Sequence, residues 1–324
     1  MSKQTVLLII CFLAVLFSVK EIKSAQSDND TSIVENILPD GDNDISLGYT
    51  LFKQKKYEEA KTKFLAVVDR NPKNDKAYIY LGIIFSRRGE KEKAIEAFKK
   101  ALEINPDNSE AHFNIGIEYY NDKQFYKSLN HLKKDLSFLP NDYRAISVMG
   151  SIYFELNDTD RALEYLLKSE SISPGSAGNL IKIADCYRVL GRLDDEIEVY
   201  RKILKIQSSF YVYYRLGLAL GDKGDIAGEI DCYKKALSMR PDHKDVRFNL
   251  GVSYYDIGEY ELALSEFLKI KDDDNIDVEL IYYLGLTDLR LNKISDAWQV
   301  YETIKKIDPE TADNLYDMIK RYSD

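Results

Sequence analysis

The sequence is poor in the residues from which metal sites, disulfide frameworks and membrane spans are built. Its 324 residues include three cysteines, three histidines and one tryptophan. Cys11, Cys186 and Cys232 are far apart and form no C-x-x-C motif. We therefore expect neither a zinc cage nor a disulfide framework. Runs of 18 or more apolar residues are also missing, so the sequence predicts no ordinary transmembrane helix.

Basic residues are also fewer than acidic residues. Forty-five Lys and Arg stand against 54 Asp and Glu, which gives a net charge of −9. An acidic chain has no general attraction for phosphate backbones, so no nucleic-acid partner is expected. The sequence contains no G-x-S-x-G, no H-E-x-x-H and no phosphate-binding glycine loop. We therefore expect neither an enzyme nor a cofactor.

Residues 1–25 have the pattern of a secretory signal peptide. Lys3 precedes an uncharged, largely apolar run from Val6 to Val19, which suits a signal peptide and is short for a membrane span. Cleavage near Ala25 predicts export to the periplasm, the cell envelope or the medium. The alternative is an uncleaved membrane anchor over residues 6–19, the one segment expected to contact a membrane. Residues 26–40 form an acidic linker with a possible half-helix.

A period of 34 residues organises the rest of the chain. Prolines at 72, 106, 140 and 174 recur at this spacing, and three further columns share the phase. The first column is glycine: Gly48, Gly82, Gly116, Gly150, Gly217, Gly251 and Gly285, with Ala184 in the fifth place. The second is small: Ala60, Ala94, Ser128, Ala162, Ala263 and Ala297, with Glu196 and Glu229 in the fifth and sixth places. The third is large: Phe64, Phe98, Leu132, Leu166, Tyr200, Tyr233, Phe267 and Tyr301.

This pattern resembles the tetratricopeptide repeat. The unit at 75–108 carries nearly every signature residue: Tyr78, Leu81, Gly82, Phe85, Ala94, Phe98, Ala101 and Pro106. The resemblance implies an all-α fold, a right-handed superhelical solenoid of antiparallel helix pairs. It predicts a C-terminal capping helix over 312–324 and eight units at 41–74, 75–108, 109–142, 143–176, 177–209, 210–243, 244–277 and 278–311.

The resemblance also implies a concave groove lined by the first helix of each unit. Its second, fifth, sixth, ninth, twelfth and thirteenth residues would face a bound peptide. The predicted groove residues are Ile79, Ile83, Phe113, Asn114, Ile117, Tyr120, Lys182, Asp185, Arg188, Tyr214, Arg215, Phe248, Asn249 and Tyr255. We expect Tyr214 and Phe248 to point away from the packing columns. The alternative is that neighbouring helices, or the chain's own N-terminal segment, cover this lining.

The function expected from this reading is an exported, non-enzymatic scaffold. It would bind a protein or peptide segment in its groove, during assembly of an envelope complex. The alternative is an envelope transport component that holds a small molecule or lipid there. Lys182, Asp185 and Arg188 in unit five, with Arg215 after them and Arg144 before them, would form a polar, net-positive centre that binds a carboxylate of the partner. The alternative is that these charges pair among themselves.

Units five and six break the repeat pattern. Unit five is one residue short, and Ser208 stands where proline is expected. Glu196 and Glu229 either reach water or pair with neighbouring arginines. We expect residues 178–237 to open first and to form a hinge. His112 and His131 are not expected to bind a metal, and a bridge between Cys186 and Cys232 remains possible.

Overall fold

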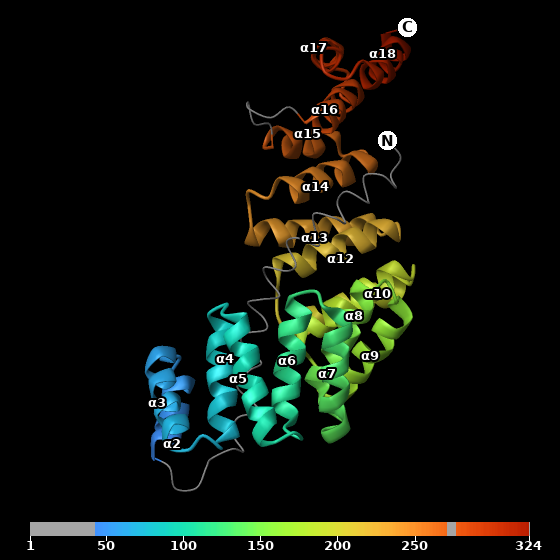
Figure 1. Cartoon of the computed structure of the whole chain (residues 1–324). Coiled ribbons are helices and arrows are strands. Elements are labelled where there is room, and N and C mark those ends of the chain that lie inside the picture. The colour runs from blue at the N-terminus through green and yellow to red at the C-terminus, as the bar shows by residue number, and fades with distance from the viewer. Residues whose placement is uncertain (1–42, 271–276, 324) are drawn as a thin grey trace. The chain divides into compact units, whose positions relative to one another are not determined.

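The computed structural model describes residues 43–270 and 277–323, and these residues form α-helices and short turns only. The predicted signal peptide and acidic linker lie outside the described residues. The chain divides into two compact units, one ending at Leu190 and the other beginning at Gly191. Figure 1 shows the helices of each unit following one another in sequence order.

The first unit holds four complete helix pairs and one further helix. The first helices of its repeats are α2 (Asn43–Lys53), α4 (Asp75–Arg87), α6 (Ser109–Asn121), α8 (Tyr143–Glu155) and α10 (Ala177–Val189). The second helices are α3 (Tyr57–Arg70), α5 (Lys91–Ile104), α7 (Phe125–Phe138) and α9 (Thr159–Ile172). Each second helix packs against the first helices of its own repeat and of the next one. In addition α4 contacts α6, α6 contacts α8 and α8 contacts α10. The first helices therefore form a layer of their own.

The second unit continues the same arrangement. Its helices are α11 (Leu193–Ile206), α12 (Phe210–Asp222), α13 (Ile226–Met239), α14 (Lys244–Asp256), α15 (Tyr260–Leu268), α16 (Val278–Arg290), α17 (Ile294–Ile304) and α18 (Pro309–Ser323). The last helix, α18, buries Ala312, Leu315 and Ile319 against α16 and α17. It covers the apolar end of the repeat array, as predicted for a capping helix. Within the described part of the chain, no helix is long and apolar enough to span a lipid bilayer.

The glycine and large-residue columns fit together in six of the helix pairs, at Gly48, Gly82, Gly116, Gly150, Gly217 and Gly251. A Cβ added to Gly48 would lie 2.9 Å from the ring of Phe64, and one added to Gly150 would lie 2.7 Å from Cγ of Leu166. At Gly82 an added Cβ would overlap the ring of Phe98. The large side chain of the second helix thus occupies the space that glycine leaves on the first. This contact explains why the two columns keep a fixed spacing in the sequence.

The turn inside every repeat contains one residue in the left-handed region. Its φ lies between 56° and 83° at Lys55, Gly89, Lys123, Asn157, Gly191, Gly224, Gly258 and Asn292. Such a residue ends a helix by reversing the chain direction, and glycine and asparagine adopt it most readily. A tight turn then starts the second helix, and in every repeat but the fifth the two helices pack side by side.

The fifth repeat departs from two columns of the pattern. Ala184 adds a Cβ in the glycine column, and Glu196 replaces the alanine that follows it. The division between the two compact units falls at this repeat, between α10 and α11. The alternative in which Glu196 reaches water is wrong, because its exposed fraction is only 2%.

The junction after α11 also differs from the regular ones. Asn74, Asn108, Asp142 and Ser176 each accept a hydrogen bond from the backbone at the start of the next helix, as N-caps do. Ser209 makes no such bond to the start of α12, and Gln207 and Ser209 are extended. The missing proline at Ser208 therefore accompanies an uncapped helix.

Candidate peptide-binding face

The first helices of the first unit carry a face of half-buried apolar side chains. On α6, Phe113, Ile117 and Tyr120 follow the i, i+4, i+7 spacing that places them on one side of a helix. Ile83 on α4 is half-buried too. Ile79 is different, because it is 6% exposed and packs in a core cluster with Phe98 and Ile115. For Ile79 the predicted groove position is in fact a core position.

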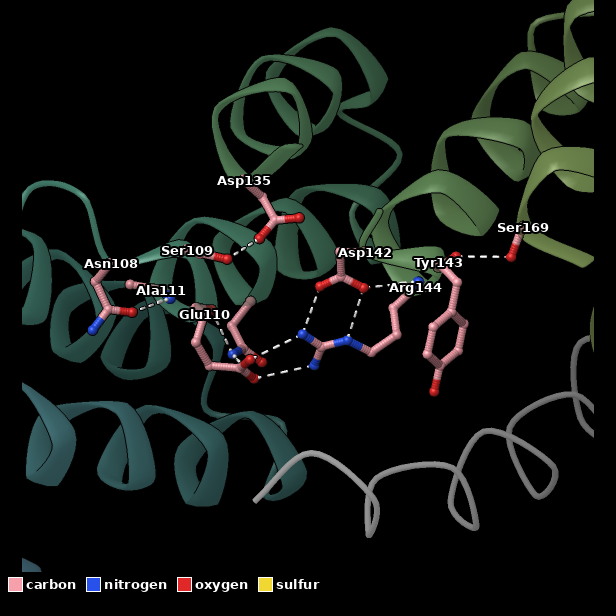
Figure 2. Close-up of polar contacts among 10 residues, drawn as sticks. Asn108, Ser109, Glu110, Ala111, Asp135, Asp142, Tyr143, Arg144 and Ser169 are labelled. Carbon is pink, nitrogen blue, oxygen red and sulfur yellow. Dashed lines mark hydrogen bonds and ion pairs between the residues drawn. The ribbon is translucent and has the colours of Figure 1, made fainter. Parts of the chain in front are cut away.

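An ion-pair network joins the start of α6 to the start of α8 (Figure 2). The guanidinium of Arg144 donates to both carboxylate oxygens of Asp142, with distances of 3.1 Å from Nε and 2.6 Å from Nη2. It also donates to Glu110 Oε1 at 3.4 Å and to Glu110 Oε2 at 3.1 Å. The same guanidinium lies 4.3 Å from the centre of the Phe113 ring, within cation–π range.

Arg144 is therefore already occupied by carboxylates of its own chain. Burial works against its charge, but Glu110 and Asp142 hold the pKa of Arg144 above its usual range. Two carboxylates around one guanidinium leave a net negative charge. The expected net-positive centre cannot count Arg144 among its cations, which is a correction to the sequence analysis.

The side-chain amide of Asn114 bonds within its own helix, α6. Its Nδ2 donates to the Glu110 carbonyl oxygen at 2.7 Å and to Glu110 Oε1 at 3.1 Å. A peptide backbone would have to replace these bonds before it could accept from this amide. Asn249, at the same position of α14, is half-buried.

A buried carboxyl group lies beside this network. Asp135 on α7 has no exposed surface and accepts a hydrogen bond from Ser109 Oγ through Oδ1, while Oδ2 has no hydrogen-bond partner. Burial raises the pKa of Asp135 to about 7, with Ser109 opposing the shift and the Asp142 carboxylate adding to it. The corresponding residue of the next repeat, Ser169, donates to the Tyr143 carbonyl oxygen at 2.8 Å (Figure 2). Asp135 therefore places a titratable group at a position that is otherwise neutral.

The three charged residues predicted to line the groove in the fifth repeat all lie on α10. Lys182, Asp185 and Arg188 are all half-buried. The first turn of this helix holds Asn179, whose Nδ2 donates to the Leu166 carbonyl oxygen at 3.0 Å and whose Oδ1 accepts from Ser147 Oγ at 3.0 Å. These bonds anchor α10 to α8 and α9.

In the second unit the predicted aromatic residues lie close to buried rings. Tyr214 is 6.2 Å, centre to centre, from Tyr233, and Phe248 is 5.8 Å from Phe267. Both are half-buried and pack on the core cluster of this unit. The expectation that they point away from the packing columns is therefore wrong. Truncating them would remove core contacts as well as any contact with a partner.

Further along this face the aromatic side chains meet one another. The ring of Tyr283 lies 5.5 Å from Phe248 and 5.9 Å from Tyr255, both in edge-on geometry. Arg290 lies over Tyr255, with its guanidinium 5.9 Å from the ring centre. Tyr283 was not singled out in the sequence, although it follows Tyr282 directly.

Arg215 is buried, so it does not line an open groove. Its exposed fraction is 6%, and its Nη1 donates to the hydroxyl of Tyr211. The guanidinium also lies 6.0 Å from the centre of the buried Tyr200 ring. This second correction leaves Lys182 and Arg188 as the half-buried cations of the predicted centre.

Histidine and cysteine side chains form local contacts. The Nδ1 atoms of His112 and His131 are 3.2 Å apart, and His112 Nε2 lies 3.2 Å from the Pro106 carbonyl oxygen. The carbonyl can only accept, so Nε2 of His112 carries a proton. Burial lowers the pKa of His131 to about 4. Across residues 43–270 and 277–323, no three side chains of His, Cys, Asp or Glu converge as metal ligands would. Cys186 and Cys232 are both free and buried, so the possible bridge between them is not formed.

The network residues Glu110 and Asp142 were missed in the sequence. Glu110 and Arg144 occupy the second position of successive repeats, 34 residues apart, and carry opposite charges. That spacing is a usable signal, because the first helices of successive repeats contact each other. Asp142 looks like an ordinary N-cap residue, and its bond to the Arg144 backbone N at 2.9 Å supports that role too.

Comparison with known families gives one consistent answer. Five family profiles, each described as tetratricopeptide repeat, match residues 46–74, 75–108, 97–130, 143–176 and 214–275. Together they cover more than half of the chain.

Curated relatives match shorter stretches. Protein FlbA of Caulobacter vibrioides is 28% identical over 125 residues, which are 37% of this chain and 21% of FlbA. An uncharacterised protein of Methanocaldococcus jannaschii is 32% identical over 57 residues, which are 18% of this chain and 66% of that protein. The chain thus spans about a fifth of the length of FlbA and 66% of the archaeal protein.

Solved structures show the same fold at low identity. PilW, described as a widely conserved type IV pilus biogenesis factor, matches with a TM-score of 0.57 and 19% identity, over 64% of this chain and 96% of PilW. A tetratricopeptide repeat protein from Parabacteroides merdae matches with a TM-score of 0.51 and 18% identity, over 75% of this chain and 97% of that one. The family profiles, the helix pairs and these structures agree, and the chain belongs to the tetratricopeptide repeat family of protein-interaction scaffolds.

Proposed function

We propose that this chain is an exported, non-enzymatic scaffold that binds an extended segment of another protein along the first-helix face of its repeats. The complex would form in the cell envelope. The observation that carries the proposal is the row of half-buried apolar and aromatic side chains on these helices, represented by Phe113, Ile117 and Tyr120 in the first unit and Val252 and Tyr255 in the second.

Large side chains that keep part of their surface in water gain free energy when a partner covers them. Concentration on one face, rather than scatter over the surface, is typical of interaction sites. The ion pairs around Arg144 join α6 to α8 beside Phe113, so they would fix the orientation of a bound segment more than its affinity. Export is supported by the apolar run from Val6 to Val19.

Site-specific photo-crosslinking in the native host tests the proposed face. A photoreactive amino acid would replace Ile117 on α6 or Val252 on α14, both on first helices. Leu167 on α9 and Leu262 on α15 are matched controls, because they are exposed apolar residues on second helices. We expect protein adducts from the first pair and few from the second.

Three other outcomes would contradict the proposal. Equal adducts at all four positions would place the partner elsewhere. Adducts with the mass of a lipid or metabolite would favour a transport component that holds a small molecule. N-terminal sequencing of the native protein checks export separately: a start near Ala25 or Gln26 supports cleavage, whereas an intact Met1 on a cytoplasmic protein would exclude export.

A further inference from the structure

The sixth repeat differs from its neighbours at two positions that meet in space. The penultimate residue of the first helix is large in most repeats, as with Tyr120, Phe154 and Tyr255, but on α12 it is Gly221. The small column of the second helix holds alanine or serine in the regular repeats, but on α13 it holds Glu229. One position has lost a side chain, and the other has gained a long acidic one.

The carboxylate of Glu229 lies directly against Gly221. A Cβ built on Gly221 would be 2.7 Å from Glu229 Oε1 and 3.0 Å from Oε2. These distances are too short for any side chain, so this position of the carboxylate requires glycine at 221. The two exceptions to the repeat pattern therefore form one structural unit, which we call the Gly221 notch and define by Gly221 and Glu229.

Gly221 lies on the same helix face as the aromatic row. Tyr214, Leu218 and Gly221 follow the i, i+4, i+7 spacing on α12. All three are half-buried, as is Glu229. The carboxylate thus comes from the second helix, but it stands beside the first-helix face to which we assign partner binding.

Hydrogen bonds hold the carboxyl group of Glu229 in this place. It bonds to the hydroxyl groups of Tyr233 on its own helix and Ser253 on α14. Burial raises the pKa of Glu229, these hydroxyls oppose the shift, and the carboxylates of Asp256 and Asp222 add to it. The notch also lies in the last turn of α12, where the helix dipole is negative. The three carboxylates and the helix dipole all favour a cation beside Glu229.

Resting on the proposed function, we propose that the Gly221 notch receives a lysine or arginine side chain of the bound protein segment, with Glu229 as its counter-ion. Glycine leaves the space in which the Glu229 carboxylate lies against α12, beside the first-helix face where the partner's cationic group would meet it. The carboxylate, desolvated on one side, supplies a charge-assisted hydrogen bond. The notch would thus fix the register of the segment, because only one of its positions can carry the basic residue.

Selection from a randomised library of 12-residue peptides tests this inference with the full-length chain. Wild-type protein and Glu229→Gln would be used in parallel, since glutamine keeps the shape and removes the charge. Wild-type selections should enrich apolar residues together with Lys or Arg at one fixed position. Glu229→Gln selections should keep the apolar preference and lose the basic one. Glu261→Gln, which removes an exposed carboxylate on α15, should behave as wild type.

Affinity measurements on one selected peptide complete the test. Replacing its basic residue by norleucine should weaken binding to wild type roughly tenfold, and should change binding to Glu229→Gln little. Gly221→Ala, which displaces the carboxylate, should resemble Glu229→Gln. A basic preference that persists in Glu229→Gln, or a wild-type preference without basic residues, would overturn the inference and leave the proposed function standing. Failure of every selection, with folded protein, would count against the proposed function itself.

Discussion

The buried carboxyl group of Asp135 makes the stability of the first unit depend on pH. Its folded-state pKa is about 7, against 3.8 for an unperturbed aspartate. The folded chain therefore holds this proton more tightly than the unfolded chain. The resulting stabilisation is fully present below about pH 4, is lost as the pH rises, and is gone above about pH 7.

The size of the effect follows from the difference in pKa. About three units at roughly 1.4 kcal/mol each give about 4 kcal/mol in total, of which about 3 kcal/mol falls between pH 5 and pH 8.5. Asp135→Asn keeps an oxygen that accepts from Ser109, and it stays neutral at every pH. We therefore expect the variant to gain stability relative to wild type by up to this amount as the pH rises.

Urea unfolding followed by circular dichroism at pH 5 and pH 8.5 measures the difference. Asp69→Asn, which removes an exposed carboxylate on α3, is the control for a change of net charge alone. Parallel pH profiles for wild type and Asp135→Asn would refute the reasoning. They would show that the carboxyl group finds water or a partner in solution and ionises at no cost.

Three further predictions concern packing, the ion-pair network and local opening. Gly82→Ala should lower the free energy of unfolding by about 1–3 kcal/mol, because its methyl group overlaps Phe98; Gly178→Ala, with open space around it, should raise it by about 0.5–1 kcal/mol. Arg144→Met should cost about 3 kcal/mol in urea unfolding at pH 7, since it leaves two carboxylates without their cation, and a neutral result would mean that the pair is fully hydrated. Hydrogen exchange should be faster over 178–237 than over 77–101, and uniform protection would argue against a weak fifth repeat.

The fifth repeat shows how a local departure from the pattern can be interpreted. Ala184 stands in the glycine column and Glu196 in the small-residue column, where the regular repeats have glycine and alanine or serine. Both departures were visible in the sequence, and the boundary between the two compact units, after Leu190, falls within the 178–237 stretch that we expect to open first. Burial of Glu196 was not visible there. A glutamate side chain can lie along a helix or extend from it, and only its surroundings select between the two.

The helical repeats could be predicted because the residues that form and pack their helices recur at a fixed spacing. Proline, glycine, small-residue and large-residue columns recur about every 34 residues, and in six of the repeats the glycine meets the large residue of the second helix. The site was less predictable. The residues of the candidate site differ from one repeat to the next, so the repeat pattern does not predict which of them come together.

The sequence alone therefore determined the helix pairs, the capping helix and the helices from which a binding face would come. Tertiary structure decided which charges are already neutralised, as at Arg144, and which carboxyl groups are buried, as at Asp135. It also decided that Gly221 and Glu229 belong together. The physical reason is that repeat spacing sets where a backbone runs, whereas the state of a charged side chain depends on neighbours from other helices. Those neighbours become defined only when the helices pack.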